Sequence, residues 1–381
     1  MIDYRHTSKT LTRTICCTLD SDGHDEALEA LAATQRAFNA TATWIARVCW
    51  DEGIANTNTA HHRVYGETRA DFGLGAQLAV CARAKAVEAI KAVKAKRRDT
   101  CPTFGPRGSV RCDARTYRLM SLDRVSLNTL QGRVVCRLLL GPRQHEMLVD
   151  PAWAVGGADL VWRNGTYYLH IAQSRQAPPE AEGDGGTLGV DLGITNLATD
   201  SEGEHFTGKI IHLVRNRYHL RRQRLQKVGT KNAKRRLRQM RRRESRSQSD
   251  TNHCISKRLV QKAAVARKAI ALEDLSGIRQ RTTVRREHRY ERHSWAFSQL
   301  RQCISYKAAW AGIPVHLVDP RNTSRTCSEC GHCDKANRTS QESSLCRRCG
   351  FAANADYNAA LNISRKEWAA VNRPIASPLA G

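Results

Sequence analysis

Cys327-Ser-Glu-Cys330 and Cys346-Arg-Arg-Cys349, followed by Ala355-Asp-Tyr-Asn-Ala-Ala-Leu-Asn-Ile363, form the stretch that decides the fold. Fifteen residues separate the two cysteine pairs, a spacing that predicts one zinc ion held by four thiolates. Asp356 follows Cys349 by seven residues, at the expected start of a short helix. A zinc knuckle just ahead of such an acid, with two more acids on strands upstream, indicates a nuclease.

Length and hydropathy narrow the class of protein. A chain of 381 residues can form one large core or two to three domains. No run approaches the roughly 18 consecutive apolar residues that a membrane helix needs. Residues 1–20 also lack the basic start, apolar centre and small-residue cleavage site of a signal peptide. We therefore expect a cytoplasmic protein that makes no use of a membrane.

The chain has 14 cysteines, and only the four in the two pairs have ligand spacing. In the cytoplasm, cysteines are more often thiols or metal ligands than disulfides. Cys333 lies near the knuckle, but the two pairs already fill a tetrahedral site. We expect the other ten cysteines to be small, buried apolar side chains.

The charge predicts a polyanionic partner, because the formal net charge is +26 and the pI is near 10.0. Between Lys209 and Gln248, 16 Lys or Arg face one acid, Glu244, so this segment alone carries +15. A solvated helical face would alternate its charges, which this segment does not. We expect a helical nucleic-acid contact that includes Arg217, Arg221, Arg222, Arg224, Lys234, Arg235, Arg236, Arg238, Arg241 and Arg242.

The N-terminal half predicts helices inserted into a β structure. Residues 10–20 have a strand pattern, and two apolar seams at helical spacing run from Leu28 to Cys49 and from Leu78 to Val93. From residue 110 to 173 the pattern is again β, with a hairpin that turns on Asn164-Gly165. Residues 177–186 have the Pro, Gly and acidic composition of a linker.

The C-terminal half alternates strands and helices, which predicts an α/β domain interrupted by the knuckle. Leu188, Val190 and Leu192 share one face of a strand, and Asp191 points from the other. In the strand 269–275, Glu273 likewise opposes the buried apolar positions. A helix over residues 294–311 and a strand over 313–319 follow.

Asp191, Glu273 and Asp356 are the predicted catalytic residues. Three acids on three elements can hold two divalent ions about 3.5 to 4 Å apart, one activating water and one stabilising the leaving oxygen of a phosphodiester. An unpaired charge in an apolar strand costs several kcal/mol, and a metal compensates for it. We therefore expect two Mg²⁺ ions, with Mn²⁺ as a substitute. Asp274 is an alternative second ligand, but its phase relative to Ala271 favours Glu273.

The order of these motifs resembles that of TnpB, the family of transposon-encoded RNA-guided DNA endonucleases, which are similar to compact type V CRISPR effectors. The likeness covers about residues 187–366, whereas the N-terminal half matches only in its order of strand, helices and β structure. The four blocks that carry it are Gly189-Val-Asp-Leu-Gly-Ile194, Leu272-Glu-Asp-Leu275, Thr323-Ser-Arg-Thr-Cys-Ser-Glu-Cys-Gly331 and Ala355-Asp-Tyr-Asn-Ala-Ala-Leu-Asn-Ile363. Ser294-Trp-Ala-Phe297 and Tyr306-Lys-Ala308 add support.

The resemblance implies a multidomain α+β fold. An N-terminal wedge-like β-barrel with a helical recognition insertion would precede an RNase H-like α/β RuvC nuclease domain with an inserted zinc ribbon. The implied boundaries are 1–20 and 100–176 for the barrel, 21–99 for the recognition lobe, 177–186 for the linker, 187–320 and 350–368 for the nuclease domain, 321–349 for the zinc-ribbon target-loading module, and 369–381 for a flexible tail.

The resemblance also implies the partners. A guide RNA would pair with one strand of a double-stranded DNA target, while the protein reads a short motif beside that target. Asp191, Glu273 and Asp356 would be the magnesium ligands, and the basic segment would contact the RNA–DNA heteroduplex. The protein would then be prokaryotic and associated with the nucleoid. Arg325 stands where relatives often carry Gln, and Arg338 resembles a family arginine whose position the intervening residues leave open.

Three alternatives stay open. A transposase can use an RNase H fold, but its acids usually follow the order Asp, Asp, Glu. An RNA-guided repressor would have a decayed site, whereas all three acids are present here. A CRISPR-type effector would be the same enzyme with a guide from an array. The sequence does not separate that last alternative from TnpB, and it leaves the oligomeric state, adjacent motif and cut positions undefined.

Overall fold

The computed structural model describes residues 10–180, 186–193, 195–275, 297–340 and 342–371. It divides into two compact units, Met1–Gln176 and Ala177–Gly381, and the boundary between them in the sequence falls at the start of the predicted linker. Parts of several predictions lie outside the described residues, namely 1–9 of the barrel, 181–185 of the linker, Ile194 of the first motif, 276–296 of the nuclease domain with the start of its helix, residue 341 of the zinc ribbon and 372–381 of the tail. No described helix is both long and apolar enough to cross a membrane.

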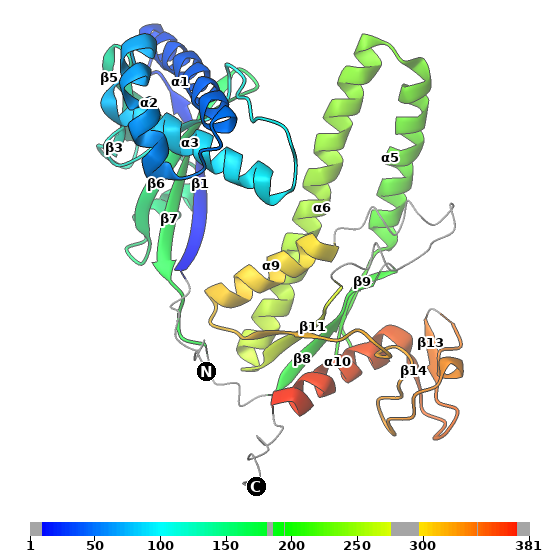
Figure 1. The fold of residues 1–381 in the computed structure, drawn as a ribbon. Coiled ribbons are helices and arrows are strands. Elements are labelled where there is room, and N and C mark those ends of the chain that lie inside the picture. Colours follow the sequence, from blue (N-terminus) through cyan, green and yellow to red (C-terminus); the bar gives the residue numbers. More distant parts are fainter. Residues whose placement is uncertain (1–9, 181–185, 194, 276–296, 341, 372–381) are drawn as a thin grey trace. The chain divides into compact units, whose positions relative to one another are not determined.

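Within its described residues, the first unit combines one antiparallel sheet with four helices (Figure 1). The predicted first strand and both predicted long helices are confirmed. In chain order the elements are β1 (Thr10–Asp20), α1 (Asp25–Asp51), α2 (Thr57–Phe72), α3 (Ala76–Ala95), β2 (Val110–Cys112), β3 (Tyr117–Leu119), β4 (Arg124–Thr129), β5 (Gly132–Leu139), α4 (Pro142–Val149), β6 (Ala154–Arg163) and β7 (Thr166–Gln176).

The seven strands follow the order β2-β6-β7-β1-β5-β4-β3, with β1 between β7 and β5. The predicted hairpin joins β6 to β7, and Asn164 and Gly165 both have positive φ, 53° and 84°, as its tight turn requires. The edge strands β2 and β3 are joined by residues 113–116. The Tyr117 hydroxyl on β3 also donates to the Gly156 carbonyl on β6. These links draw the two edges of the sheet together.

The core of the first unit lies between the sheet and helices α1 and α3, which pack against each other. Phe38 and Ile45 of α1 and Ile90 of α3 are completely buried, each stabilising the fold by about 1.5–3 kcal/mol through apolar burial. Helix α2 was not predicted, because it buries only Ala60, Val64 and Thr68. Its N-terminus is defined by the Asn56 side chain, which accepts two backbone N–H groups.

The second unit has a mixed five-stranded sheet in the order β10-β9-β8-β11-β12, in which β8, β11 and β12 are parallel (Figure 1). Its elements are β8 (Thr187–Asp191), β9 (Asn196–Asp200), β10 (His205–Thr207), α5 (Lys209–Val228), α6 (Lys231–Val265), β11 (Ala269–Glu273), α9 (Phe297–Trp310), β12 (Val315–Val318), η2 (Lys335–Asn337), β13 (Ser343–Leu345), β14 (Ala352–Asn354) and α10 (Ala355–Val371). The alternating α/β pattern predicted from the sequence is confirmed.

Alternation along β8 and β11 assigns each residue to one of two faces. Val190 and Leu272 pack with α6 and α9 in the larger core of this unit. Gly189 lies on the opposite face, directly beneath α10, where an added Cβ would lie 2.1 Å from the Ala360 carbonyl oxygen. Because side chains two residues apart share a face, Asp191 also lies on the α10 side. The sheet therefore directs this acid toward the helix that begins at Ala355.

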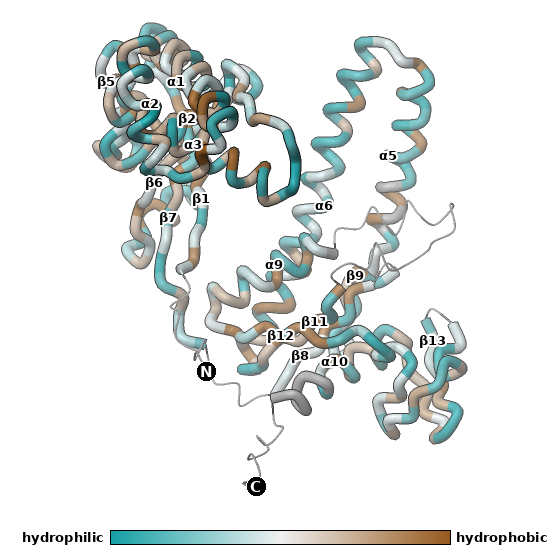
Figure 2. Tube along the Cα trace, in the orientation of Figure 1, coloured by the Kyte–Doolittle hydropathy of each residue, from teal (hydrophilic) through white to brown (hydrophobic). Residues whose placement is uncertain are grey.

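Helices α5 and α6 form a hairpin that carries the predicted basic segment (Figure 1). Gly229 ends α5 with a φ of 67°, and the Thr230 hydroxyl caps α6 by accepting from the Ala233 N–H. The second half of α6, from Asn252 to Ala263, supplies the buried face that anchors the hairpin on the sheet. The first half and α5 are mostly hydrophilic (Figure 2).

Candidate functional site

Three carboxylates come together where the sheet meets α10. Asp191 ends β8, Glu273 ends β11, and Asp356 lies in the first turn of α10. Glu273 and Asp356 are buried, at 8% and 9% exposure, and Asp191 is partly buried. The Asn354 side chain accepts the N–H groups of Asp356 and Tyr357, which fixes the start of the helix.

Asp191 lies close enough to Glu273 and Asp356 for their negative charges to affect its pKa. Burial raises the pKa of its carboxyl well above the ordinary value, and the negative charges of Glu273 and Asp356 raise it further. Arg338 opposes this shift. A cluster of carboxylates that destabilise one another's charge is the donor set that hard divalent cations bind. The residues present therefore fit a Mg²⁺ or Mn²⁺ site.

Neighbouring polar groups orient the acids. Asn196 Nδ2 donates to Asp356 Oδ2 at 2.9 Å, and Arg338 Nη2 lies 3.9 Å from Asp356 Oδ1. The Thr323 hydroxyl donates to Glu273 Oε1. The sequence left the position of Arg338 open and gave no role to Asn196 or Thr323. For Thr323 a signal was available, since it starts the block that leads to the first cysteine pair.

Asp274, the alternative second ligand, is engaged elsewhere. Arg301 Nη1 of α9 lies 3.0 Å from Asp274 Oδ1. Because α9 packs in the core on the sheet face opposite α10, this ion pair draws Asp274 away from Asp191 and Asp356. The arrangement favours Glu273 as the second member of the carboxylate cluster.

The four predicted zinc ligands converge. The sulfur atoms of Cys327, Cys330, Cys346 and Cys349 all lie within 4.8 Å of one another. The Cys327–Cys349 and Cys330–Cys346 sulfur distances are 3.7 and 3.5 Å. Among the described residues, no other group of three or more His, Cys, Asp or Glu side chains converges as tightly. The carboxylates of Asp191, Glu273 and Asp356 are therefore farther apart than the four cysteine sulfurs. The cysteine cluster is compatible with zinc binding.

Backbone and side-chain hydrogen bonds hold the two cysteine loops together. The N–H groups of Cys349 and Arg348 point at the Cys346 sulfur and lower the pKa of that thiol to about 6. The buried Asn337 donates to the carbonyls of Arg325 and His332 in the first loop and accepts from the Arg347 N–H in the second. The loops are thus arranged for a thiolate-bound ion by contacts that do not involve the ion.

Burial of the other ten cysteines was predicted correctly for six. Cys17, Cys49, Cys81, Cys112, Cys136 and Cys303 are buried. The prediction was wrong for the four others, because Cys16, Cys254 and Cys333 are exposed and Cys101 is half-buried. A cysteine is small enough to be tolerated on either face of an element, so periodicity is a poor guide to its burial.

The predicted basic contacts lie along α5 and the first half of α6. Nine of the ten are exposed, namely Arg217, Arg221, Arg224, Lys234, Arg235, Arg236, Arg238, Arg241 and Arg242. Arg222 differs, since its guanidinium is half-buried and lies 2.5 Å from the Glu244 carboxylate, where it joins α5 to α6. The hairpin therefore presents a basic surface that one internal ion pair helps to hold in shape.

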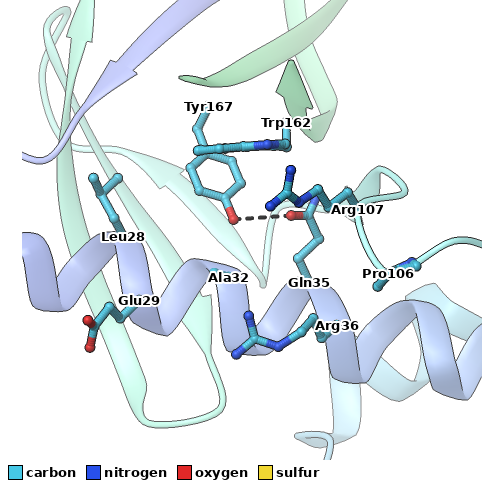
Figure 3. Close-up of a pocket in the computed structure, with 9 residues that line it drawn as sticks. All are labelled: Leu28, Glu29, Ala32, Gln35, Arg36, Pro106, Arg107, Trp162 and Tyr167. Atoms are coloured by element: carbon cyan, nitrogen blue, oxygen red, sulfur yellow. Dashed lines mark hydrogen bonds between the residues drawn. The ribbon is translucent and has the colours of Figure 1, made fainter. Parts of the chain in front are cut away.

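A separate cavity of about 410 Å³ lies in the first unit (Figure 3). Figure 3 shows the Tyr167 hydroxyl, which donates a hydrogen bond to the Gln35 side-chain oxygen, beside the side chains of Trp162 and Arg107. The lining comprises Leu28, Glu29, Ala32, Gln35, Arg36, Pro106, Arg107, Trp162 and Tyr167. With Glu29 as its one carboxylate, this lining offers no ligand set for two metal ions. The carboxylate cluster is therefore the better candidate for hydrolytic chemistry.

Comparisons with known proteins extend over both units. Residues 297–363 match the family described as Cas12f1-like, TNB domain. The fold resembles that of Cas12f1 in a complex with single-guide RNA and target DNA, with a TM-score of 0.66, 14% identity, and coverage of 94% of this chain and 99% of that one. It also resembles the RNA-guided endonuclease Cas-phi3, with a TM-score of 0.56, 11% identity, and coverage of 97% and 94%. The chain thus has the multidomain α+β fold of compact type V effectors.

Curated relatives confirm the resemblance to TnpB and compact type V effectors. Cas12f1 of Sulfoacidibacillus thermotolerans, an endodeoxyribonuclease, is 44% identical over 115 residues, which is 30% of this chain and 26% of that one. Cas12f2 of a Micrarchaeota archaeon is 33% identical over 224 residues, which is 53% of this chain and 41% of that protein. A TnpB-like protein of Methanocaldococcus jannaschii is 35% identical over 125 residues, which is 32% of this chain and 44% of that protein. The chain thus aligns with less than half the length of each of these relatives.

Proposed function

We propose that this protein is an RNA-guided DNA endonuclease that hydrolyses DNA phosphodiesters at a guide-complementary target beside a short motif. The observation that carries the proposal is the convergence of Asp191, Glu273 and Asp356 from β8, β11 and α10. The names of the relatives support it, since two of them are endodeoxyribonucleases. The partners are a guide RNA and double-stranded DNA, and the protein acts at the nucleoid of a prokaryotic cell.

Asp191, Glu273 and Asp356 would hold two Mg²⁺ ions, for which Mn²⁺ can substitute. Such ions supply an activated water and charge stabilisation at the leaving oxygen. The protein's own contribution is to fix the carboxylates, through the Thr323 hydroxyl at Glu273 and the Asn196 amide at Asp356. Arg338 adds a positive charge within reach of the same cluster. Cys327, Cys330, Cys346 and Cys349 would hold one structural zinc ion.

The proposed domain roles follow the chain. The wedge-like barrel is assigned to residues 1–20 and 100–176, which include the described strands of the first unit, and the recognition lobe to residues 21–99, which include helices α1, α2 and α3. Residues 187–320 and 350–368 are the RuvC-like nuclease domain, and 321–349 the zinc-ribbon module that loads the target. The predicted start of the tail at residue 369 was wrong, because helix α10 continues to Val371. The link between the edge strands β2 and β3 supports closure of the barrel.

The basic hairpin gives a testable prediction for nucleic-acid binding. If α5 and α6 follow a phosphate backbone, affinity should fall steeply with salt, because each neutralised phosphate adds about 0.9 to the log–log slope on duplex DNA and about 0.7 on single strands. Changing the exposed Arg235, Arg236, Arg241 and Arg242 to Glu should flatten that slope in a filter-binding or anisotropy titration.

A matched control replaces the same four residues, Arg235, Arg236, Arg241 and Arg242, by Lys. These changes keep the net charge at each exposed position. This variant should keep most of the slope. If the wild type and the variant with the four Glu replacements in α6 have equal slopes, the surface of the hairpin does not bind nucleic acid.

The proposed activity is tested with protein purified from a cell that expresses its natural locus. Sequencing the copurified RNA should identify a discrete guide, and its flanking sequence tells a transposon end from a CRISPR array. The complex should cut DNA that matches this guide in Mg²⁺, and EDTA should stop cleavage. Bound but uncut DNA across a library of adjacent motifs would favour the repressor alternative. Strand joining would favour a transposase.

A further inference from the structure

One short segment connects the zinc ligands with the carboxylate cluster. Residues 323–328 lead from the end of β12 into the first cysteine pair, and we call them the brace. Thr323, Cys327 and Ser328 are buried, with exposures of 3%, 2% and 1%. The brace is therefore an internal part of the second unit, although it has no regular secondary structure apart from one bridge between Thr326 and Cys333.

The N-terminal end of the brace contacts Glu273. The Thr323 hydroxyl donates to Glu273 Oε1, and both residues are buried. The same oxygen lies 3.0 Å from the Pro320 carbonyl. A hydroxyl has a single proton, and the charged acceptor forms the stronger bond. Thr323 therefore restrains the rotamer of this carboxylate and occupies one of its oxygens.

The rest of the brace is held by α10, the helix that carries Asp356. Asn362 Nδ2 donates to the carbonyls of Thr323 and Thr326 at 2.8 and 2.7 Å. One turn earlier, Asn358 donates to the Thr326 carbonyl at 2.8 Å and accepts from the Ser328 N–H at 2.9 Å. Both amides are buried, and their spacing of four residues aligns them on one helix face. The brace thus ties Glu273 to the helix of Asp356.

We propose that Thr323 is a positioning residue for Glu273, and that the brace makes the geometry of the carboxylate cluster depend on the zinc loops. The inference rests on the proposed endonuclease function. Cys327 lies inside the anchored stretch, next to Ser328, so the cysteine loops hold the brace from one side and α10 from the other. Supporting residues that orient metal ligands are commonly worth about 10- to 100-fold in metal affinity or activity.

The test removes the hydroxyl and keeps the shape. Thr323→Val should lower the cleavage rate about 10- to 100-fold and raise the Mg²⁺ concentration for half-maximal rate. Target binding and zinc content should match those of the wild type. Thr323→Ser, which retains the donor, should recover most of the rate. Mn²⁺ affinity, measured by electron paramagnetic resonance on the same proteins, should fall for Thr323→Val and recover for Thr323→Ser.

Thr326→Val is the matched control. Its hydroxyl donates to the Asn322 carbonyl within the same turn and touches no carboxylate. This variant should keep wild-type Mn²⁺ affinity and Mg²⁺ dependence. An equal loss in Thr326→Val, or unchanged Mn²⁺ affinity in Thr323→Val, would overturn the inference. If the wild type never cuts DNA, the endonuclease proposal fails, and the Mn²⁺ measurement still decides the role of Thr323.

Discussion

Asp191→Ala should reduce cleavage of guide-matched DNA by a factor on the order of 1,000 or more. The pKa of Asp191 is raised by burial and by the negative charges of both other acids, so all three carboxylates act on one another. Its removal takes a ligand from the ions that carry most of the charge stabilisation at the reacting phosphate. Glu273→Ala and Asp356→Ala should have effects of similar size. Gel-based single-turnover assays measure the loss.

Binding should survive these changes, because phosphate contacts and base pairing elsewhere supply the affinity. The three variants should therefore bind guide and target with the wild-type dissociation constant. Asp274→Ala is the control, since this neighbouring acid pairs with Arg301 rather than with the cluster. It should cut within a few-fold of the wild type. If Asp191→Ala cuts as fast as the wild type, the assigned active site is wrong.

Cys327→Ser combined with Cys330→Ser should remove the zinc ion and much of the activity. Elemental analysis should find about one zinc per wild-type chain, because four thiolates leave no open position. The binding free energy of such an ion, on the order of 10 kcal/mol, is also local folding energy. Loss of the ion should release the brace, so Mn²⁺ affinity at the carboxylate cluster should fall together with the zinc content.

Cys333→Ser provides the comparison for this experiment. Cys333 is exposed and lies three residues beyond Cys330, outside the four converging sulfurs. The variant should retain its zinc, its thermal stability and its cleavage rate. A double variant that has lost the zinc yet cuts at full rate would refute the structural role of the zinc and its coupling to Glu273, and a fully active wild type without zinc would refute the zinc site itself.

Much of the second unit could be predicted from the sequence, because its signals are local. The alternation around Asp191 gives both the strand and the face of the acid, and the cysteine spacing gives the cluster of four thiols. The phase of the strand favours Glu273 over Asp274, which in the structure pairs with Arg301. In each case a few neighbouring residues carry the information, so no knowledge of the tertiary fold is needed.

Other features depend on contacts between distant residues. Thr323 starts the block that leads to the first cysteine pair, but its contact with Glu273, 50 positions earlier, is visible only in the fold. Arg338 reaches Asp356 only because the zinc loops fold back on themselves. Helix α2 has too thin an apolar stripe to be recognised, and its side chains are buried by packing against α3. These are positions where tertiary contacts override local pattern.

The order of the ligands along the chain has a consequence for synthesis. Asp191 and Glu273 leave the ribosome first, the four cysteines follow, and Asp356 emerges last on a helix that must lie directly on Gly189. Because translation adds roughly 5–20 residues per second from the N-terminus, a nascent chain holds two of its three acids for some time without a complete site. A chain that stops before Asp356 should therefore lack one of the three proposed metal ligands and cut no DNA.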